Sequence, residues 1–172
     1  MSNIKACDGI HKAEITDLAR LTEIYNQAIL TQRCTCDIRT FTVRERQLWF
    51  SEHQTGRFPI FVYEMKGKVV GYSYISPYRP GRKALCDVCE ISYYIDFDYH
   101  RRGIGSRLME YTIQKAVEKG FVNMIAILLS CNSGSIALLK KFGFSEWGAL
   151  PEIAQMDNAL YSHLYYGKKL KK

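Results

Sequence analysis

Residues 99–106 read Tyr99-His100-Arg101-Arg102-Gly103-Ile104-Gly105-Ser106, and this stretch decides the fold of the chain. It follows a run of strand-forming residues (87–95) and precedes apolar residues at helical spacing (104–119). The free N–H groups at the start of a helix carry partial positive charge and bind phosphate groups. Small residues allow a phosphate to approach the backbone closely, and arginines add positive charge. The pattern therefore predicts a pyrophosphate-binding loop between a strand and a helix.

The loop alone does not specify a ligand, because two glycines can also mark an ordinary tight turn before a helix. A lone Gly-x-Gly is weak evidence for phosphate binding. The Gly-Lys-Ser/Thr ending of a Walker loop is missing. A Rossmann fingerprint needs a third glycine and a different place in the chain. Further residues must supply the specificity.

The segments on either side of this loop alternate between strand and helix patterns. Thr16 or Asp17 can cap a first helix, and Thr42 with Glu45 forms a capping box for a second. The helix at 104–119 is the third, and a fourth starts after Asn132 and stops near Gly143, a common helix-ending residue. Strands are expected at 4–11, 58–64, 69–75, 87–95, 124–129, 145–153 and 163–170, with a loop at 76–83. This order predicts a mixed α/β protein with one central sheet, in a single domain over residues 1–172.

Composition and charge narrow the class of protein. With 47% hydrophobic and 24% charged residues, the 172-residue chain has the composition of a soluble globular protein. No apolar run approaches the roughly 20 residues that cross a bilayer, and the N-terminus lacks a secretory signal, so we expect a cytoplasmic location without membrane contact. The net charge of +7 would suit nucleic acid, but four lysines sit in the last five residues and two arginines in the phosphate loop. Nucleic-acid binding is therefore the weaker interpretation.

Six cysteines raise the question of a metal site. Cys34 and Cys36 have one intervening residue, which is tighter than structural zinc spacing. Cys86 and Cys89 fall in or beside a predicted strand, where side chains alternate between faces. We expect reduced thiols and no metal.

Two signatures together resemble the GNAT (Gcn5-related N-acetyltransferase) superfamily. Its cofactor loop reads Gln/Arg-x-x-Gly-x-Gly/Ala after the fourth strand, and here the first position is His100. The second signature is a buried strand, then Asn132, then a helix ending in Phe142-Gly143-Phe144. Nearly the whole chain further resembles the phosphinothricin N-acetyltransferase-like group, including a glutamate (Glu90) on the strand before the loop.

The resemblance implies a mostly antiparallel sheet of about seven strands, splayed between strands four and five, with about four helices. It implies a homodimer that moves an acetyl group from acetyl-CoA to a small amino-acid-like amine, of the phosphinothricin or methionine-sulfone type. The pantetheine arm would pair with the backbone of the fourth strand, and the loop would bind the pyrophosphate. The residues implied in cofactor binding are Tyr93, Tyr94, Ile95, Arg101, Arg102, Gly103, Ile104, Gly105, Ser106 and Asn132.

Acetyl transfer to an amine needs a base, and Glu90 is the candidate. A charge among apolar neighbours on a strand needs a reason, although a strand carboxylate that merely faces solvent or pairs with an arginine is the ordinary alternative. Other acceptor-side positions depart from the family: Leu85 stands near a usual aromatic residue, Tyr161 where a histidine is usual, and His163 is out of register. In many members of the superfamily the position of Leu139 holds a tyrosine that can protonate the departing thiolate. Leucine cannot do this, which leaves Tyr161, a water molecule or no general acid at all.

Two other functions stay open at this point. One is acetylation of a protein N-terminus, a polyamine or a drug amine. The other is a module that senses acetyl-CoA without catalysis, which would have no use for a base at Glu90.

Overall fold

The structure is a computed structural model that describes residues 9–54, 56–156 and 158–170. The described residues form seven strands in one sheet, in the order β1-β2-β3-β4-β5-β7-β6, and four α-helices. Neighbouring strands are antiparallel except β4 and β5, which are parallel. The predicted fold class is confirmed. The strands are β1 (Gly9–Lys12), β2 (Ile60–Met65), β3 (Lys68–Pro77), β4 (Val88–Ile95), β5 (Asn123–Leu129), β6 (Ser145–Met156) and β7 (Ala159–Lys169).

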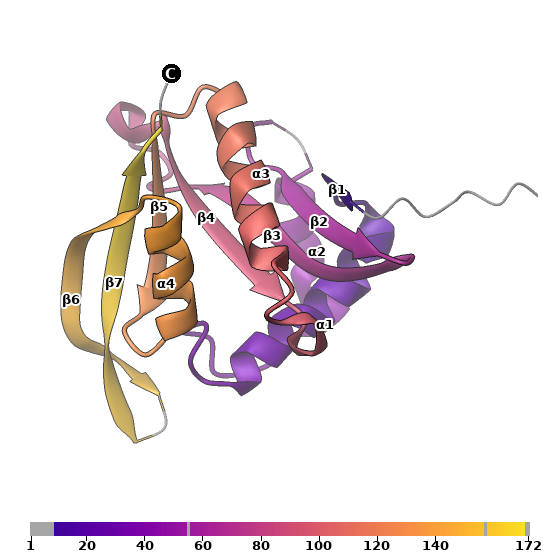
Figure 1. Ribbon diagram of the computed structural model, residues 1–172, viewed down its shortest axis with the longest axis horizontal. Helices are drawn as coiled ribbons and strands as arrows, with labels where there is room; N and C mark the ends of the chain where they lie inside the picture. Colours follow the sequence, from indigo (N-terminus) through magenta and orange to yellow (C-terminus); the bar gives the residue numbers. More distant parts are fainter. Residues whose placement is uncertain (1–8, 55, 157, 171–172) are drawn as a thin grey trace, which may run out of the picture.

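The helices cover both faces of the sheet (Figure 1). α1 (Leu18–Leu30) and α2 (Val43–Glu52) pack on one face, and α3 (Ile104–Glu118) and α4 (Ser133–Lys141) pack on the other. Because side chains alternate along a strand, β4 serves both cores. Its buried Cys89 and Ile91 belong to the core under α3 and α4. Tyr94 contacts the core under α1 and α2.

The start of α2 follows the predicted signal, but the start of α1 does not: Thr16 lies within the 3-10 turn Ile15–Asp17, and the Asp17 side chain makes no capping hydrogen bond to α1. Thr42 and Glu45 form the predicted capping box at α2: the Glu45 N–H donates to the Thr42 hydroxyl, and the Thr42 N–H donates to the Glu45 carboxylate at 2.7 Å. α1 begins at Leu18, directly after Asp17. The Asp17 carboxylate accepts from the Glu14 N–H at 2.8 Å and so caps a short 3-10 turn that leads into α1.

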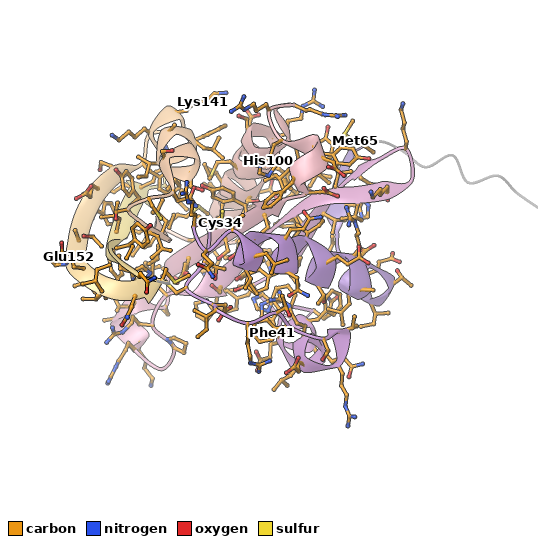
Figure 2. The ribbon with its side chains drawn as sticks, turned by 90° about the horizontal axis from the view of Figure 1, so that it is seen from below. Cys34, Phe41, Met65, His100, Lys141 and Glu152 are labelled. Carbon is orange, nitrogen blue, oxygen red and sulfur yellow. The ribbon has the colours of Figure 1, made fainter. Side chains whose placement is uncertain are left out.

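Several strand ends differ from the predictions. β1 begins at Gly9 and ends at Lys12, whereas the prediction covered 4–11, of which 4–8 lie outside the described residues. β3 runs into the predicted 76–83 loop because Pro77 still pairs with Cys89. β6 and β7 are longer than predicted, since they pair as a hairpin whose outer strand is exposed and shows no apolar alternation. Glu152 in this hairpin and Met65 in the β2–β3 hairpin lie at opposite ends of the molecule (Figure 2).

The sheet divides at its centre. β4 and β5 pair at only three positions, of which Glu90 with Ile125 is the last. β4 remains paired with β3 up to Ile95, which lies opposite Gly71. Beyond Glu90 the edge of β4 that faces β5 therefore has no strand partner, and the predicted splay between strands four and five is present.

Candidate active site

A cavity of about 540 Å³ lies where β4 and β5 separate. A volume of this size is typical of small-molecule sites. It is lined by Ile91–Ile95 of β4, by most of the loop that leads into α3, by residues 126–128 of β5 and by the first turn of α4. Tyr93, Tyr94 and Ile95, the residues predicted to pair with a pantetheine arm, all line it. Their backbone is accessible on the β5 side because strand pairing ends at Glu90.

The predicted phosphate loop closes one end of this cavity. Gly103 is the N-cap of α3 and has a left-handed backbone (φ 79°), and Arg101 is also left-handed (φ 58°). Left-handed residues before a helix turn backbone N–H groups toward a common point, where they bind anions. The His100 ring, labelled in Figure 2, donates from Nε2 to the Ile95 carbonyl at 3.0 Å. His100 thus holds the loop against the end of β4.

Of the predicted loop residues, Arg102 alone does not line the cavity. Its guanidinium donates to the Asp98 carbonyl at 3.0 Å and lies 5.0 Å from the centre of the Tyr99 ring. Arg101, Gly103, Ile104, Gly105 and Ser106 all line the cavity, as predicted.

A lysine absent from the predicted site joins the loop. Lys141, in the last turn of α4, donates to the Ser106 hydroxyl at 3.1 Å (Lys141 is labelled in Figure 2). It adds a positive charge beside the helix start that is predicted to bind pyrophosphate. Thirty-five residues separate the two side chains, so only their packing in the fold brings them together.

Asn132 caps α4 from the other side of the cavity. Its Oδ1 accepts from the Ser135 N–H at 3.1 Å, which is the geometry of a helix N-cap. The residue lines the cavity, so its cap role and its predicted cofactor contact are compatible.

A buried ion pair stabilises the start of the phosphate loop. Asp96, which is 2% exposed, pairs with Arg20 of α1 and accepts from the Asp98 N–H at 3.0 Å. Arg20 also donates to the Val69 carbonyl at 3.0 Å. The pair connects α1 to the residue at which β4 turns into the phosphate loop.

Glu90 lies where the strands part, one residue before the cavity lining begins at Ile91. Burial alone raises the pKa of its carboxyl to about 7. No charged partner contributes to this shift, so Glu90 does not pair with an arginine, and the burial that raises its pKa distinguishes it from a carboxylate that merely faces solvent. Burial is the main cause of the raised pKa of the Tyr74 phenol on the neighbouring strand, and the nearby charge of Glu90 adds to it. A carboxylate that titrates near neutral pH is suited to accept a proton.

The other acceptor-side positions are only partly brought to the cavity. Leu139 lines it and has no polar group. Tyr161 and His163 are in β7, on the far side of β5, and do not line it. Leu85 ends a short 3-10 turn, Lys83–Leu85, before β4. Tyr161, like Glu90, is thus not among the residues that line the cavity.

Of the described cysteines, Cys131 lies close enough to Cys34 and Cys36 to interact with both electrostatically. Cys34, labelled in Figure 2, lines the cavity, while Cys89 is buried and its thiol donates to the Asn123 carbonyl at 3.6 Å. Cys86 follows the 3-10 turn rather than lying in the strand. Within the described ranges no three His, Cys, Asp or Glu side chains are grouped to hold a metal ion.

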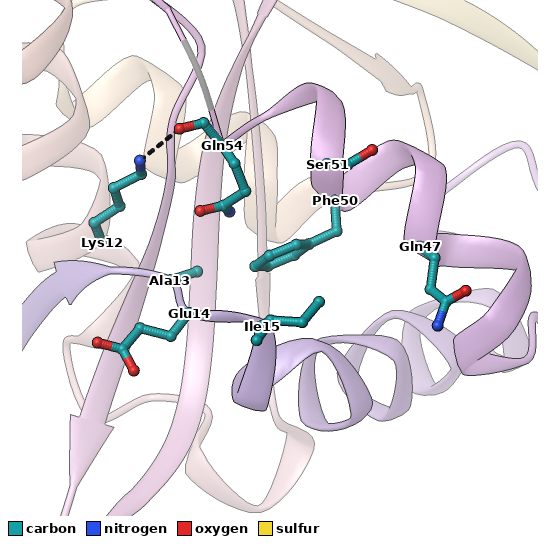
Figure 3. Close-up of a pocket in the computed structure, with 8 residues that line it drawn as sticks. All are labelled: Lys12, Ala13, Glu14, Ile15, Gln47, Phe50, Ser51 and Gln54. Atoms are coloured by element: carbon teal, nitrogen blue, oxygen red, sulfur yellow. Dashed lines mark hydrogen bonds between the residues drawn. The ribbon is translucent and has the colours of Figure 1, made fainter.

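A second hollow, of about 530 Å³, lies between the end of β1 and α2 (Figure 3). The ring of Phe50 faces Ile15 across it, and Lys12 donates to the Gln54 carbonyl at 2.7 Å at its edge. It shares no residue with the cavity between β4 and β5. In the part of the chain that is described, none of the helices has the length and apolar character to cross a membrane.

The cavity fits the parts of coenzyme A. The N–H groups that open α3 suit a pyrophosphate. The free edge of β4 suits the amides of a pantetheine arm, which can pair like an additional strand. A Cβ on Gly105 would lie 3.3 Å from the end of the Leu138 side chain, a tight contact, and 3.6 Å from Ile95, an ordinary one, at the point where α3, α4 and β4 meet.

Known proteins share both sequence and fold with this chain. The YwnH protein of Bacillus subtilis (strain 168) is 34% identical over 92% of this chain and 96% of its own length. An L-methionine sulfoximine/L-methionine sulfone acetyltransferase of Salmonella typhimurium (strain LT2) is 31% identical over 84% of each chain. The crystal structure of a phosphinothricin acetyltransferase from Sinorhizobium meliloti in complex with acetyl-CoA superposes with a TM-score of 0.89, at 27% identity, over 94% of this chain and 88% of that one.

The family model for the Acetyltransferase (GNAT) family matches residues 19–144. This range runs from the start of α1 to the end of α4 and includes Glu90, the phosphate loop and Asn132. The chain therefore belongs to the GNAT family of acetyltransferases and is an N-acetyltransferase.

Proposed function

We propose that this enzyme transfers the acetyl group of acetyl-CoA directly to the amine of a small amino-acid-like acceptor, of the phosphinothricin or methionine-sulfone type, with Glu90 as general base. The observation that carries the proposal is the half-buried carboxylate where β4 and β5 separate, whose pKa partial burial raises to about 7. The names of the related enzymes support the acceptor class.

Different residues along the cavity bind different parts of acetyl-CoA. The start of α3, with Arg101 and Lys141 nearby, binds the pyrophosphate, and Asn132 contacts the cofactor from α4. The free edge of β4 aligns the pantetheine arm and supplies an N–H for the thioester oxygen as negative charge develops there. Acetyl-CoA, when bound, supplies the activated acyl group.

Glu90 removes a proton from the acceptor amine. An aliphatic amine is mostly protonated at neutral pH and must lose a proton before it attacks a carbonyl. A carboxylate with a pKa of about 7 is half ionised at neutral pH, and it is a stronger base than an ordinary glutamate. It takes the proton directly or through one water molecule.

The test is the Glu90→Gln variant, which keeps the size of the side chain and removes the base. We expect kcat to fall on the order of 100-fold, while the KM for acetyl-CoA stays within about twofold. In the wild type, kcat/KM rises with pH through about 7, because the ionised form of Glu90 is the active one. This limb disappears in the variant, whereas a limb at higher pH from the acceptor amine remains.

The matched control is Glu52→Gln at the exposed end of α2, outside the cavity, which leaves the rates unchanged. Acceptors are screened by release of free thiol from acetyl-CoA, using amino acids and their analogues beside polyamines and peptides. Equal turnover by Glu90→Gln and wild type would remove Glu90 from the mechanism. Turnover of peptides or polyamines alone would remove the amino-acid-like acceptor.

A further inference from the structure

Two cysteines that are far apart in the chain meet beside the cavity between β4 and β5. Cys34, in the segment between α1 and α2, lines this cavity. Cys131 lies in the turn between β5 and α4. The Cys131 thiol donates to the carbonyl of Arg33, the residue that precedes Cys34, at 3.9 Å. The two thiols therefore lie near one another where the strands of the sheet separate.

The backbone geometry limits the distance between these residues. A carbonyl oxygen lies roughly 3 Å from the Cα of the next residue in a trans peptide. Since the Cys131 sulfur lies 3.9 Å from the Arg33 oxygen, it is within about 7 Å of the Cys34 Cα. Disulfide-bonded cysteines have their Cα atoms about 4.4–6.8 Å apart. The segment 31–42 contains no helix or strand, so a modest shift of this loop brings the two sulfurs into bonding distance.

Electrostatic contacts agree with this placement. Burial is the main cause of the raised pKa of the Cys131 thiol, and the nearby Cys34 adds to it. Burial is also the main cause of the raised pKa of the Tyr93 phenol on β4, and Cys34 contributes there too. Cys34 therefore lies between β4 and the turn that follows β5, beside the edge along which the pantetheine arm is proposed to bind.

Cys36 is the third cysteine nearby, but its part of the segment is held by α1. The Tyr25 hydroxyl shares a hydrogen bond with the Thr35 hydroxyl at 3.1 Å and donates to the Asp37 carboxylate. These contacts fix the residues on both sides of Cys36. Cys36 is also exposed and does not line the cavity. The geometry thus favours the cysteine that lines the cavity as the partner of the one before α4.

A bond between the two sulfurs would change the wall of the cavity. The Cys131 carbonyl accepts from the Ser133 N–H at 3.0 Å. Asn132, between these two residues, is the N-cap of α4 and lines the cavity. A bond to Cys34 replaces the contact of the Cys131 thiol with the Arg33 carbonyl and draws the turn and the loop together. Asn132, which is proposed to contact the cofactor, moves with the turn.

We propose that Cys34 and Cys131 are a site of oxidative modification, at which a disulfide forms, narrows the cavity and weakens the binding of coenzyme A. The effect on binding rests on the proposed cofactor site, whereas formation of the bond does not. Both residues are partly exposed, so a small disulfide such as oxidised glutathione can reach them as the oxidant.

The oxidation proceeds by thiol–disulfide exchange. One cysteine thiolate attacks oxidised glutathione and releases one glutathione, and the second cysteine thiolate then displaces the other. Two electrons pass from the protein thiols to the oxidant. The products are one protein disulfide and two molecules of glutathione, which carry the two protons.

The first experiment maps the bond. Reduced protein is equilibrated with mixtures of reduced and oxidised glutathione, free thiols are blocked, and the digested peptides are analysed by mass spectrometry without reduction. We expect a peptide pair joined through Cys34 and Cys131, which Cys131→Ser abolishes. Cys36→Ser changes an exposed thiol two residues from Cys34, and as the matched control it keeps the pair.

The second experiment measures binding of desulfo-coenzyme A by titration calorimetry, because this ligand has no thiol that could reduce the disulfide. We expect the Kd of the oxidised protein to be at least about fivefold above that of the reduced protein, the lower end of typical coupling between two sites. By linkage, saturating ligand lowers the equilibrium constant of disulfide formation by the same factor. Dithiothreitol restores the lower Kd, and Cys131→Ser has one Kd under both conditions.

Thermal unfolding shows whether oxidation preserves the fold. A crosslink that closes a loop of roughly 100 residues restricts the unfolded chain, so the oxidised protein should unfold cooperatively with a Tm at or above that of the reduced protein. A Tm that falls on oxidation overturns the proposal.

The other outcomes separate this inference from the proposed function. A different cysteine pair, or no disulfide within the protein, overturns the inference, and so does an equal Kd in the two redox states. If neither redox state binds desulfo-coenzyme A, the proposed function and the effect on binding both fail, and the peptide map alone decides the disulfide. The result of the Glu90→Gln test has no bearing on either measurement.

Discussion

The environment of Glu90 opposes the charge that its proposed role requires. In the folded protein the pKa of this carboxyl is about 7, above the ordinary value of 4.5. A raised carboxyl pKa means that the folded state binds the proton more tightly than the unfolded state does. The contribution of Glu90 to stability is thus fully present below about pH 4.5 and is lost as pH rises through about 7.

Glu90→Gln, which cannot ionise, is therefore expected to be more stable than wild type at pH 8, by on the order of 2 kcal/mol. At pH 4.5 the two proteins should differ much less. Urea unfolding of both proteins at the two pH values measures the difference. An equal gap at both pH values would mean that burial does not raise this pKa.

At the scale of the element, two glycines that contact or precede α3 have different expected roles. Gly103 is expected to serve cofactor binding, and Gly71 serves the packing of β3 against the helix. Gly103 precedes the helix with φ 79°, and a Cβ there would meet nothing within 4 Å. Gly71 on β3 lies under α3, and its Cβ would lie 3.2 Å from the Tyr94 carbonyl and 3.3 Å from Leu108. A side chain at position 103 would be strained by the left-handed backbone, and a side chain at position 71 would be strained by contact with its neighbours.

For Gly103→Ala we expect a loss of about 1 kcal/mol from the left-handed backbone and a tenfold or larger rise in the KM for acetyl-CoA, because the methyl group intrudes where the pyrophosphate approaches. Gly71→Ala should lose about 1–3 kcal/mol by overpacking, with a smaller rise in the KM than Gly103→Ala shows. Chemical denaturation and steady-state kinetics on both variants provide the comparison. An unchanged KM in Gly103→Ala would show that the loop is only a helix start.

At the scale of the whole molecule, the division between β4 and β5 is the open part of the sheet. Strand pairing there stops after three positions, while β4 stays paired to β3 and β5 to β7. Backbone amides without a partner exchange with solvent readily. A ligand that binds the free edge of β4 would complete the sheet and stabilise the fold by mass action. The homodimer implied by the resemblance stays a prediction.

Hydrogen exchange with and without coenzyme A tests this description. Amides in Ile91–Ile95 that face β5 should exchange fast in the free protein and become protected when coenzyme A is added. At 100 times its Kd, coenzyme A should add about 2.7 kcal/mol of stability, which is a rise in Tm of roughly 5–10 °C for a chain of this length. Protection confined to α1 and α2 would place the ligand elsewhere.

The sequence by itself determined the features that a few neighbouring residues encode. The capping box of Thr42 and Glu45, the phosphate loop before α3 and the order of strands and helices follow from local patterns, and the structure agrees with them. The ends of β3, β6 and β7 did not follow, because backbone pairing with a neighbour extends a strand without leaving an apolar pattern in the sequence.

Only the tertiary structure decided which groups share the cavity. Lys141 reaches Ser106, and Arg20 reaches Asp96, across many residues of chain. The raised pKa of the Glu90 carboxyl results from burial. Burial is a property of packing between distant segments, and a sequence pattern can indicate a candidate residue without giving its solvent exposure or its partners.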